Sequence, residues 1–295
     1  MKARVSVLMT IYNAAPFLRE SIDSLIAQSF PDWELIAVEN GSRDESPAIL
    51  ASYQDPRIRV FSFPKNIGRT PALAFALGQV QGEYIAILDA DDTAHPQRFS
   101  QQVEFLDKDP ETVLVASWVQ QMDEKGRVFK TWEPPTDPRA LHECLGWIDP
   151  IVNSSAMFRR KAALAVGGFP QDYVYAQDFA LILALAQYGK LAVIGKYLCK
   201  LRVYSGNMSH SSKHAMDVAV EGLRLTKYAG EKLPLSKKAR RMNRSAVAKY
   251  EIRCGLAMFR SGKAFLGLTK ILSALAANPD VLWTNQLFRS PFQAV

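Results

Sequence analysis

Three carboxylates crowd into four residues directly after an apolar run, and this feature of the sequence points most clearly to chemistry. Asp89, Asp91 and Asp92 follow residues 84–88, and like charges this close repel one another unless a positive group lies among them. Mg²⁺ or Mn²⁺ suits such ligands, because either ion typically takes one or two carboxylates while substrate phosphates complete its coordination. The cluster therefore predicts a ligand that carries phosphate and is held through a metal.

The elements that position these carboxylates can be predicted from hydrophobic patterning. Apolar runs typical of buried strands alternate with segments whose apolar residues have helical spacing. The predicted strands are 5–9, 33–38, 58–63, 84–88 and 113–119, and the predicted helices are 17–26, one that opens at 44–47, 70–80, 96–106 and 177–188. This alternation predicts an α/β domain with a mostly parallel sheet that is covered on both faces.

Polar residues follow three of the predicted strands at the point where each strand ends. Thr10 and Tyr12 end the first strand, Glu39 and Asn40 end the second, and the carboxylate cluster ends the fourth. Ligands of open parallel sheets bind outside the carboxyl ends of the strands. We therefore expect these side chains to converge on one site at one edge of the sheet.

Several classes of protein are disfavoured by what the sequence lacks. It has no GxGxxG after the first strand and no GxxxxGK[ST], which argues against dinucleotide oxidoreductases and P-loop enzymes. Its three scattered cysteines follow no metal or disulfide spacing and indicate free thiols in a reducing compartment. No apolar run approaches the roughly 18 residues of a membrane-spanning helix, so we expect the chain not to cross a membrane.

The charge of the chain is unevenly distributed. The net charge is +7, yet the segment from Lys213 to Lys270 carries fourteen Lys or Arg against four Asp or Glu. Helical patterns at 215–229, 237–262 and 264–277 follow a boundary placed near residue 210. A basic cluster at 237–244 beside apolar residues such as Phe265 and Leu272 predicts a helix that lies on an anionic membrane surface. A solvated helical face is the alternative.

The ordered motifs of the first 210 residues carry a family resemblance. VSVLMTIYN, WELIAVENGSRDES, NIGRTPALAFAL, GEYIAILDADD and PQRF occur in this order, followed by NSSAMFRR, VGGF and QDFALIL. In these motifs the chain resembles the family 2 glycosyltransferases, over roughly residues 4–210. The resemblance implies a GT-A fold over 1–210, with a nucleotide-sugar half of about 1–95 and an acceptor half of about 96–210, and leaves 211–295 as a basic helical extension.

The resemblance also implies roles for individual residues. Thr10, Tyr12, Glu39 and Asn40 would line the pocket for the base and ribose. Asp91 would be the main ligand of Mn²⁺ or Mg²⁺, and Asp89 would contact both metal and donor. Asp178 stands where the family keeps its catalytic base, and Arg202 would face the diphosphate. Each of four residues also has a purely structural alternative. Asp92 could cap a helix, and Asp178 could be a favourable charge in the first helical turn. Tyr12 could be a core residue, and Arg202 could form a surface ion pair.

These implications define the expected function. We expect an inverting, metal-dependent transfer of a hexose from a nucleotide donor to a glycan or lipid-linked acceptor, in cell-surface polysaccharide biosynthesis. Because neutral Asn40 stands where many relatives carry an acidic residue, UDP-, dTDP- and GDP-sugars all stay open as donors. The expected location is cytoplasmic, peripheral on the cytoplasmic face of the membrane, and no nucleic-acid partner is expected. A sugar nucleotidyltransferase and a non-catalytic binding protein with a degenerate transferase fold are the rivals.

Overall fold

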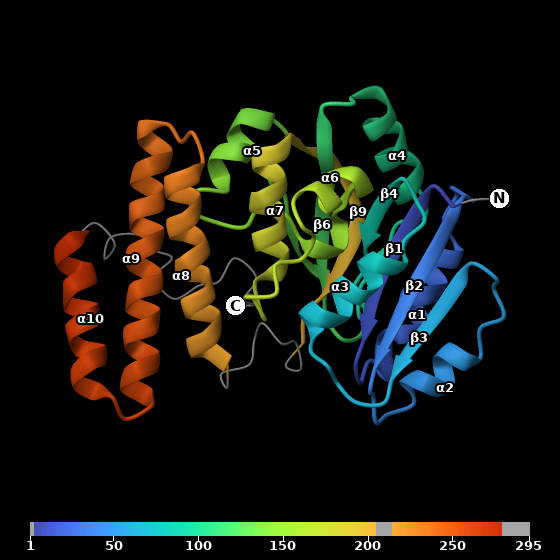
Figure 1. Cartoon of the computed structure of the whole chain (residues 1–295), viewed down its shortest axis with the longest axis horizontal. Coiled ribbons are helices and arrows are strands. Elements are labelled where there is room, and N and C mark those ends of the chain that lie inside the picture. Colours follow the sequence, from blue (N-terminus) through green and yellow to red (C-terminus); the bar gives the residue numbers. More distant parts are fainter. Residues whose placement is uncertain (1–2, 205–213, 279–295) are drawn as a thin grey trace. The chain divides into compact units, whose positions relative to one another are not determined.

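The computed structural model describes residues 3–204 and 214–278, which form two compact units (Figure 1). The sheet unit comprises residues 1–141 and 151–202, and the helical unit comprises 142–150 and 203–295, each within the described ranges. The boundary expected near residue 210 lies outside the described residues. We describe each unit by itself.

The sheet unit is built on a nine-stranded sheet in the order β3-β2-β1-β4-β8-β6-β9-β5, with β7 paired to β6. Its strands are β1 (Val5–Ile11), β2 (Trp33–Asn40), β3 (Ile58–Phe63), β4 (Tyr84–Ile87), β5 (Thr93–Ala94), β6 (Thr112–Met122), β7 (Val128–Trp132), β8 (Met157–Arg159) and β9 (Lys190–Arg202). Strands β1 to β4 pair in parallel, and β6 pairs with β9 in parallel. The predicted α/β class with a mostly parallel sheet is confirmed.

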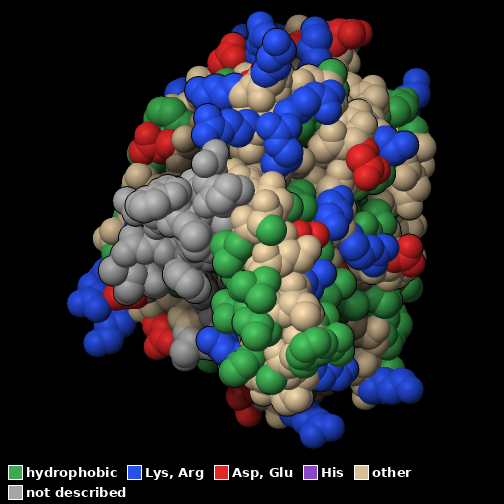
Figure 2. Space-filling model, turned by 90° about the vertical axis from the view of Figure 1, so that its left-hand side faces the viewer, with side chains coloured by type: hydrophobic (Ala, Val, Ile, Leu, Met, Phe, Trp, Pro, Cys, Tyr) green, Lys and Arg blue, Asp and Glu red, His purple; other side chains and the backbone are tan. Residues whose placement is uncertain are grey.

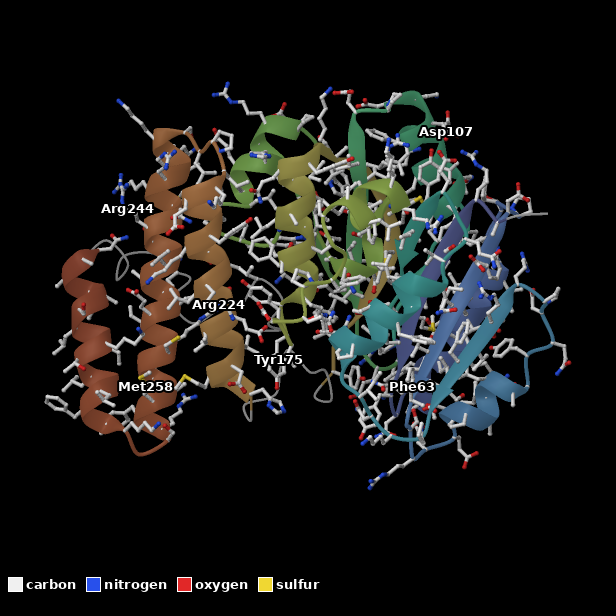
Figure 3. All side chains as sticks on the ribbon, in the orientation of Figure 1. Phe63, Asp107, Tyr175, Arg224, Arg244 and Met258 are labelled. Carbon is white, nitrogen blue, oxygen red and sulfur yellow. The ribbon has the colours of Figure 1, made fainter. Side chains whose placement is uncertain are left out.

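Strands β1, β2 and β4 are buried on both faces of the sheet, which explains why their sequences read as apolar runs. All residues of β2, and all of β1 except Thr10, are buried. Right-handed crossovers place α1 (Ala15–Ile26) and α2 (Ser46–Ala51) on one face and α3 (Arg69–Gln79) on the other. On the α3 face, the ring of Phe75 packs edge-on against Phe61 and Phe63, the latter labelled in Figure 3.

The second half of the sheet mixes strand directions. Strand β8 is antiparallel to both β4 and β6, and β5 is antiparallel to β9. The elements that accompany them are α4 (Arg98–Lys108), α5 (Pro138–Cys144), a 3₁₀ turn η1 (Asn153–Ser155), α6 (Arg160–Ala165) and α7 (Gln177–Tyr188). These elements bring η1 and the start of α7 to the edge where β1, β2 and β4 end.

The helical unit contains α8 (Ala215–Lys232), α9 (Lys237–Arg260) and α10 (Ala264–Ala277). The hydroxyl of Ser236 caps α9 by accepting a hydrogen bond from the backbone N–H of Ala239. Segment 142–150 joins this unit because Asn243 donates hydrogen bonds to the carbonyls of Gly146 and Thr226. Among residues 3–204 and 214–278, no helix is both long and apolar enough to cross a bilayer.

Candidate active site

The carboxylate cluster forms a tight turn at the end of β4. The backbone N–H of Asp92 donates to the carbonyl of Asp89 at 3.1 Å, which closes the turn directly after the last parallel contact, from Leu88 N–H to the Leu8 carbonyl. Because β1, β2 and β4 are parallel and adjacent, the segments that follow them lie at one edge. The sheet therefore presents the turn 89–92 beside the ends of β1 and β2, as the sequence predicts.

Asp89 is held by three residues from two other elements, α3 and η1. Arg69, the first residue of α3, donates through one nitrogen, Nη2, to both carboxylate oxygens of Asp89, at 2.7 and 2.8 Å. Asn153 of η1 donates to Oδ1 at 3.3 Å, and the hydroxyl of Ser154 accepts from the Asp89 backbone N–H at 3.0 Å. The carboxylate of Asp89 is thus fixed in direction and three-quarters buried, with 24% of its side chain exposed.

Arg69 is the functional residue that the sequence reasoning missed. Burial alone would lower the pKa of its guanidinium, but the charges of Asp89, Asp178 and Asp91 outweigh burial and raise that pKa. The positive group demanded by the crowded carboxylates is therefore supplied, in the free protein, by this side chain. Arg69 lies in the motif NIGRT at the start of α3, directly after Gly68 with φ of 95°, but the motif alone does not indicate the carboxylates that surround it.

Asp178 joins the same group of charges from the first turn of α7. Burial raises the pKa of its carboxyl, Arg69 opposes the rise, and Asp89 adds to it. Its neighbour Gln177, with the amide oriented to satisfy both partners, accepts from Arg69 Nε at 3.2 Å and donates to the Val174 carbonyl at 3.0 Å. The start of α7 is thereby tied to the start of α3, and a carboxylate with raised proton affinity lies within electrostatic reach of the donor-side carboxylates.

Asp92 is a buried structural carboxylate. Its side chain has no exposed surface, and its Oδ1 accepts a hydrogen bond from the backbone N–H of Arg202 at 2.8 Å. Burial, followed by the negative charges of Asp91 and Asp89, raises its pKa well above the usual range. The bond ties the carboxylate turn to the last residue of β9, so Asp92 positions the turn instead of facing a ligand.

Arg202 is engaged almost entirely by the protein itself. Its side chain is 1% exposed, and its guanidinium donates to the backbone carbonyls of Asp91, Asp123 and Glu124 and to the carboxylate of Glu20. The guanidinium carbon also lies 4.5 Å from the centre of the Phe17 ring. The structure therefore shows a buried arginine that holds the carbonyl of Asp91 in place, and the expected contact with a diphosphate stays a prediction.

The residues expected to line a base pocket lie at this edge and differ in their exposure and in their hydrogen bonds. Tyr12 is 48% exposed, which excludes the alternative of an ordinary core position, and Thr10 is half-buried. Glu39 is buried and accepts from the backbone N–H of Ser42 at 2.6 Å. The amide of Asn40 donates to Asn66 and to the Gly68 carbonyl, both at 3.2 Å, and accepts from Ile67 N–H at 2.9 Å. Asn40 therefore fixes the loop that delivers Arg69.

The loops after β1 and β2 are also bound to each other. Asn13, with φ of 51°, donates from its backbone to the Ser42 hydroxyl and accepts at its side chain from Arg43 N–H. Asp44 accepts from the backbone N–H groups of Ala15 and Ser46 at 2.9 and 3.0 Å, at the starts of α1 and α2. Burial raises the pKa of Asp44, yet these hydrogen bonds outweigh it and lower the pKa. The edge is thus pre-organised.

The donor set of this edge fits a hard divalent ion that keeps substrate or water oxygens in its shell. Within residues 3–204 and 214–278 no cluster of three His, Cys, Asp or Glu side chains is arranged around one metal position. Mg²⁺ and Mn²⁺ sites that involve phosphates need only one or two carboxylates, and Asp91 and Asp89 share the turn. Burial raises the pKa of Asp92, and the negative charges of Asp91 and Asp89 raise it further, so added positive charge would stabilise the turn.

Comparison with known proteins decides the family. The sequence model of Glycosyl transferase family 2 matches residues 6–167, more than half of the chain. The chain belongs to glycosyltransferase family 2. An uncharacterised glycosyltransferase of Haemophilus influenzae is 31% identical over 224 residues, which cover 71% of this chain and 68% of the relative. An uncharacterised glycosyltransferase of Methanocaldococcus jannaschii is 30% identical over 207 residues, 68% of this chain and 71% of the relative.

Solved structures show the same fold. Staphylococcus aureus TarS, crystallised with UDP-GlcNAc, covers 95% of this family 2 glycosyltransferase, with 81% of its own chain matched, a TM-score of 0.69 and 18% identity. The mannosyltransferase PcManGT of Pyrobaculum calidifontis, solved with GDP-Man and Mn²⁺, covers 97% of this chain, with 88% of its own chain matched, a TM-score of 0.63 and 20% identity. The expected GT-A fold with a helical C-terminal part is confirmed.

Proposed function

We propose that this family 2 glycosyltransferase transfers a hexose, with inversion, from a nucleoside-diphosphate sugar to a hydroxyl of a glycan or lipid-linked acceptor. The observation that carries the proposal is the gathering of Asp178, Asp89 and Asp91 around one guanidinium, that of Arg69. A carboxylate suited to accept a proton is thereby combined with carboxylates suited to hold a donor. The structures solved with UDP-GlcNAc and GDP-Man support this class of donor.

In this proposal Asp178 is the general base. Transfer with inversion requires the acceptor hydroxyl to lose its proton as its oxygen attacks the sugar carbon and the bond to the diphosphate breaks. A carboxylate with a pKa raised by burial accepts that proton more readily than an ordinary aspartate, and a positioned base typically contributes about 10²–10⁴-fold to the rate. Arg69 holds the donor-side carboxylate of Asp89 in a fixed direction.

A divalent metal belongs to the proposal through Asp91 and Asp89. These residues would hold Mn²⁺ or Mg²⁺, which when bound supplies Lewis-acid stabilisation of charge on the leaving diphosphate. A structural relative solved with Mn²⁺ supports this choice. A role in cell-surface polysaccharide synthesis and a cytoplasmic location complete the proposal, and the three cysteines, all described and all free thiols, support a reducing compartment.

The proposal is tested with UDP-, dTDP- and GDP-sugars in the presence of Mn²⁺ or EDTA, following nucleotide release and the anomeric configuration of the product by NMR. Asp178→Asn should lower kcat by about 10²-fold or more while donor binding is retained. Asp91→Asn should weaken metal-dependent donor binding itself. Asp172→Asn, an exposed carboxylate six positions before Asp178, is the matched control and should behave like the unaltered protein. Retained anomeric configuration, or full activity of Asp178→Asn, would overturn the assignment.

A further inference from the structure

Helix α10 of the helical unit is apolar over most of its circumference. Between Ala264 and Ala277 its only charged residue is Lys270, and its only other polar residues are Thr269 and Ser273. These three residues share one stripe, which lines a groove. The apolar part of such a helix is ordinarily covered, either in a core or in a membrane, and here it is wider than the stripe that a single neighbouring helix can cover.

Only one stripe of α10 is covered by its neighbour α9. Gly267, Ile271 and Ala274 share a face, and Ile271 and Ala274 pack into a small core with Ala248 and Ile252. The backbones approach closely, since a Cβ added at Gly267 would lie 2.5 Å from the Gly255 carbonyl oxygen. The stripe toward α9 is thus closed by small and branched side chains.

The opposite stripe of α10 is exposed. Phe265, Leu268 and Leu272, at helical spacing of three and four, are 78%, 50% and 55% exposed, and Leu266 and Phe259 add 57% and 56%. We call these five residues the apolar face. Figure 2 looks onto the helical unit from the side of α10 and shows hydrophobic side chains gathered together, with Lys and Arg side chains gathered on another part of the surface. Contiguous exposed apolar surface of this kind marks an interaction site.

The charges that flank the apolar face have one sign. Arg260 and Lys263 lie exposed in the connection between α9 and α10, and five exposed cations lie at the other end of α9: Lys237, Lys238, Arg240, Arg241 and Arg244. Figure 3 shows Arg244 near this end and Met258 near the opposite end of α9. Residues 237–278 contain ten Lys or Arg and a single acidic residue, Glu251, which pairs with Lys227 at 2.8 Å.

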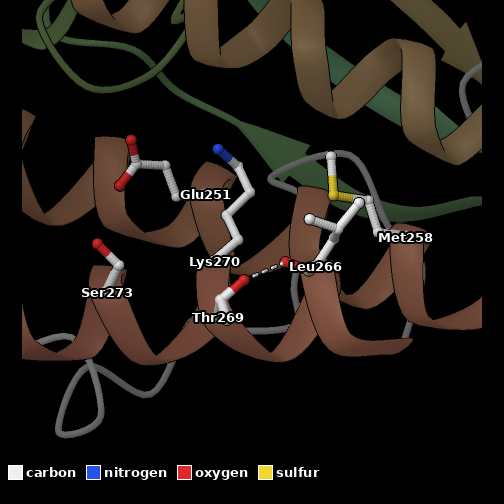
Figure 4. A pocket seen from close by; sticks show the side chains of 6 residues that line it. All are labelled: Glu251, Met258, Leu266, Thr269, Lys270 and Ser273. Carbon is white, nitrogen blue, oxygen red and sulfur yellow. Dashed lines mark hydrogen bonds between the residues drawn. The ribbon is translucent and has the colours of Figure 1, made fainter. Parts of the chain in front are cut away.

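A groove of about 440 Å³ adjoins the apolar face and shares Leu266 with it. Its lining includes Met258 and Leu266 toward one end and Lys270 farther along, beside Glu251, as Figure 4 shows, with Thr269 and Ser273 as further polar members. Because Lys270 and Glu251 carry opposite charges, the groove by itself selects no anionic ligand. The selection of an anionic partner comes from the exposed cations around the apolar face.

We propose that the apolar face of α10 binds the surface of a bilayer that contains anionic phospholipid, with the helix in the plane of the interface. Aromatic and leucine side chains enter the boundary between headgroups and acyl chains, and the flanking cations contact lipid phosphates. Charge complementarity selects this occupant over a second copy of the chain. A two-fold contact through the same face would bring two such cationic surfaces together. The inference stands independently of the proposed transfer reaction.

The test is co-flotation of the full chain with vesicles of phosphatidylcholine alone or with about a quarter phosphatidylglycerol. Binding is expected only to the anionic vesicles, and it should fall as salt rises from about 50 to about 500 mM. The double variant Phe265→Glu/Leu268→Glu should reduce binding by at least about tenfold. Phe129→Glu is the control. It makes the same apolar-to-acidic change at a 49% exposed position of β7 in the sheet unit, and this variant should bind as the unaltered chain does.

A charge variant and a folding check separate the possible outcomes. Arg260→Glu/Lys263→Glu, which leaves the apolar face intact, should weaken binding by about tenfold, and circular dichroism should show unchanged helix content in all variants. Equal binding to both vesicle types, or full binding by the double glutamate variant, would overturn the proposal. A dimer in solution would also overturn the proposal if Phe265→Glu/Leu268→Glu dissociates it, because a second copy of the chain would then cover the apolar face. A monomer that binds neither vesicle type would also overturn the proposal.

Discussion

At the scale of single residues, Arg69 couples the charges of the candidate active site. It binds Asp89 directly and opposes the burial that raises the pKa of Asp178. Sequence patterns identified the carboxylates because acidic residues after a buried strand are conspicuous. They did not identify Arg69, because one arginine at the start of a helix gives no sign of the charges that surround it in the folded chain.

The pH dependence of transfer should report the raised pKa of Asp178. A general base must be ionised, so kcat/KM should fall as the pH decreases through that pKa, at a higher pH than the ordinary aspartate value of 3.8. The profile is measured with saturating metal at each pH. A rate that stays level down to about pH 4 would contradict a base whose pKa is raised by burial.

Removing the positive charge of Arg69 should shift the pH profile of kcat/KM. In Arg69→Ala the charge that holds down the Asp178 pKa is lost, so the acidic limb of kcat/KM should shift to higher pH and donor affinity should fall. Arg69→Lys should keep the limb near its original position, because a positive charge remains, while losing the second contact that Arg69 Nε makes with Gln177. Arg43→Ala, which removes an exposed arginine after β2, serves as the control. An unshifted limb in Arg69→Ala would refute the coupling.

The buried carboxyl of Asp92 should make stability depend on pH. Its folded-state pKa lies above the unfolded value, so its protonated form favours folding, and this contribution is lost as pH rises through the raised pKa. Asp92→Asn keeps an acceptor for the Arg202 N–H and carries no charge. It should therefore be about 1 kcal/mol more stable than the unaltered chain near pH 8 and nearly equal near pH 4, by urea unfolding. Lower stability of the variant at both pH values would contradict this account.

At the scale of elements, the site depends on a close approach between the end of β2 and the loop before α3. Gly41 has φ of 73°, and a Cβ placed there would lie 2.4 Å from the Lys65 carbonyl carbon. Its neighbour Asn40 holds the same loop. The position of Arg69 therefore follows from two adjacent residues at a strand end.

Gly41→Ala should accordingly damage both stability and donor binding. The strained backbone costs about 1–2 kcal/mol, and the clash with the backbone of Lys65 adds to it by displacing the loop that carries Arg69. Gly126→Ala is the matched control, since Gly126 also has a positive φ, 78°, but nothing lies within 4 Å of the added carbon. Thermal unfolding and donor titration distinguish the two, and equal donor affinity in both variants would refute the role given to the loop.

Elements with strong local patterns were predictable, and elements defined by tertiary pairing were not. Apolar runs indicated β1, β2 and β4, because the elements that cover the sheet bury those strands on both faces. Strands β5 and β8 have two and three residues, too few to show any period. The assignment of segment 142–150 to the helical unit rests on hydrogen bonds such as that from Asn243 to Gly146. No local sequence pattern predicts such a contact between distant residues. The engagement of Arg202 by distant carbonyls was equally hidden.

At the scale of the whole molecule, the two surfaces proposed here make separate predictions for hydrogen exchange. A nucleotide with Mn²⁺ should slow exchange at the ends of β1, β2 and β4, because a bound ligand stabilises the structure that binds it. Anionic vesicles should slow exchange in α10 and leave those strand ends unchanged. Slower exchange of α10 with nucleotide alone would show that the two surfaces are not independent.

The bond between Asp92 and the backbone of Arg202 joins residues 110 positions apart in the chain. During synthesis, the acidic turn leaves the ribosome long before β9, the strand that anchors it. A growing chain of intermediate length therefore already contains β1, β2 and β4 but lacks the hydrogen bond from Arg202 that holds the turn after β4. Competence to bind a sugar nucleotide should therefore arise late, once β9 has emerged and paired. Stalled nascent chains that end before β9 should capture no donor, whereas chains extended past it should do so.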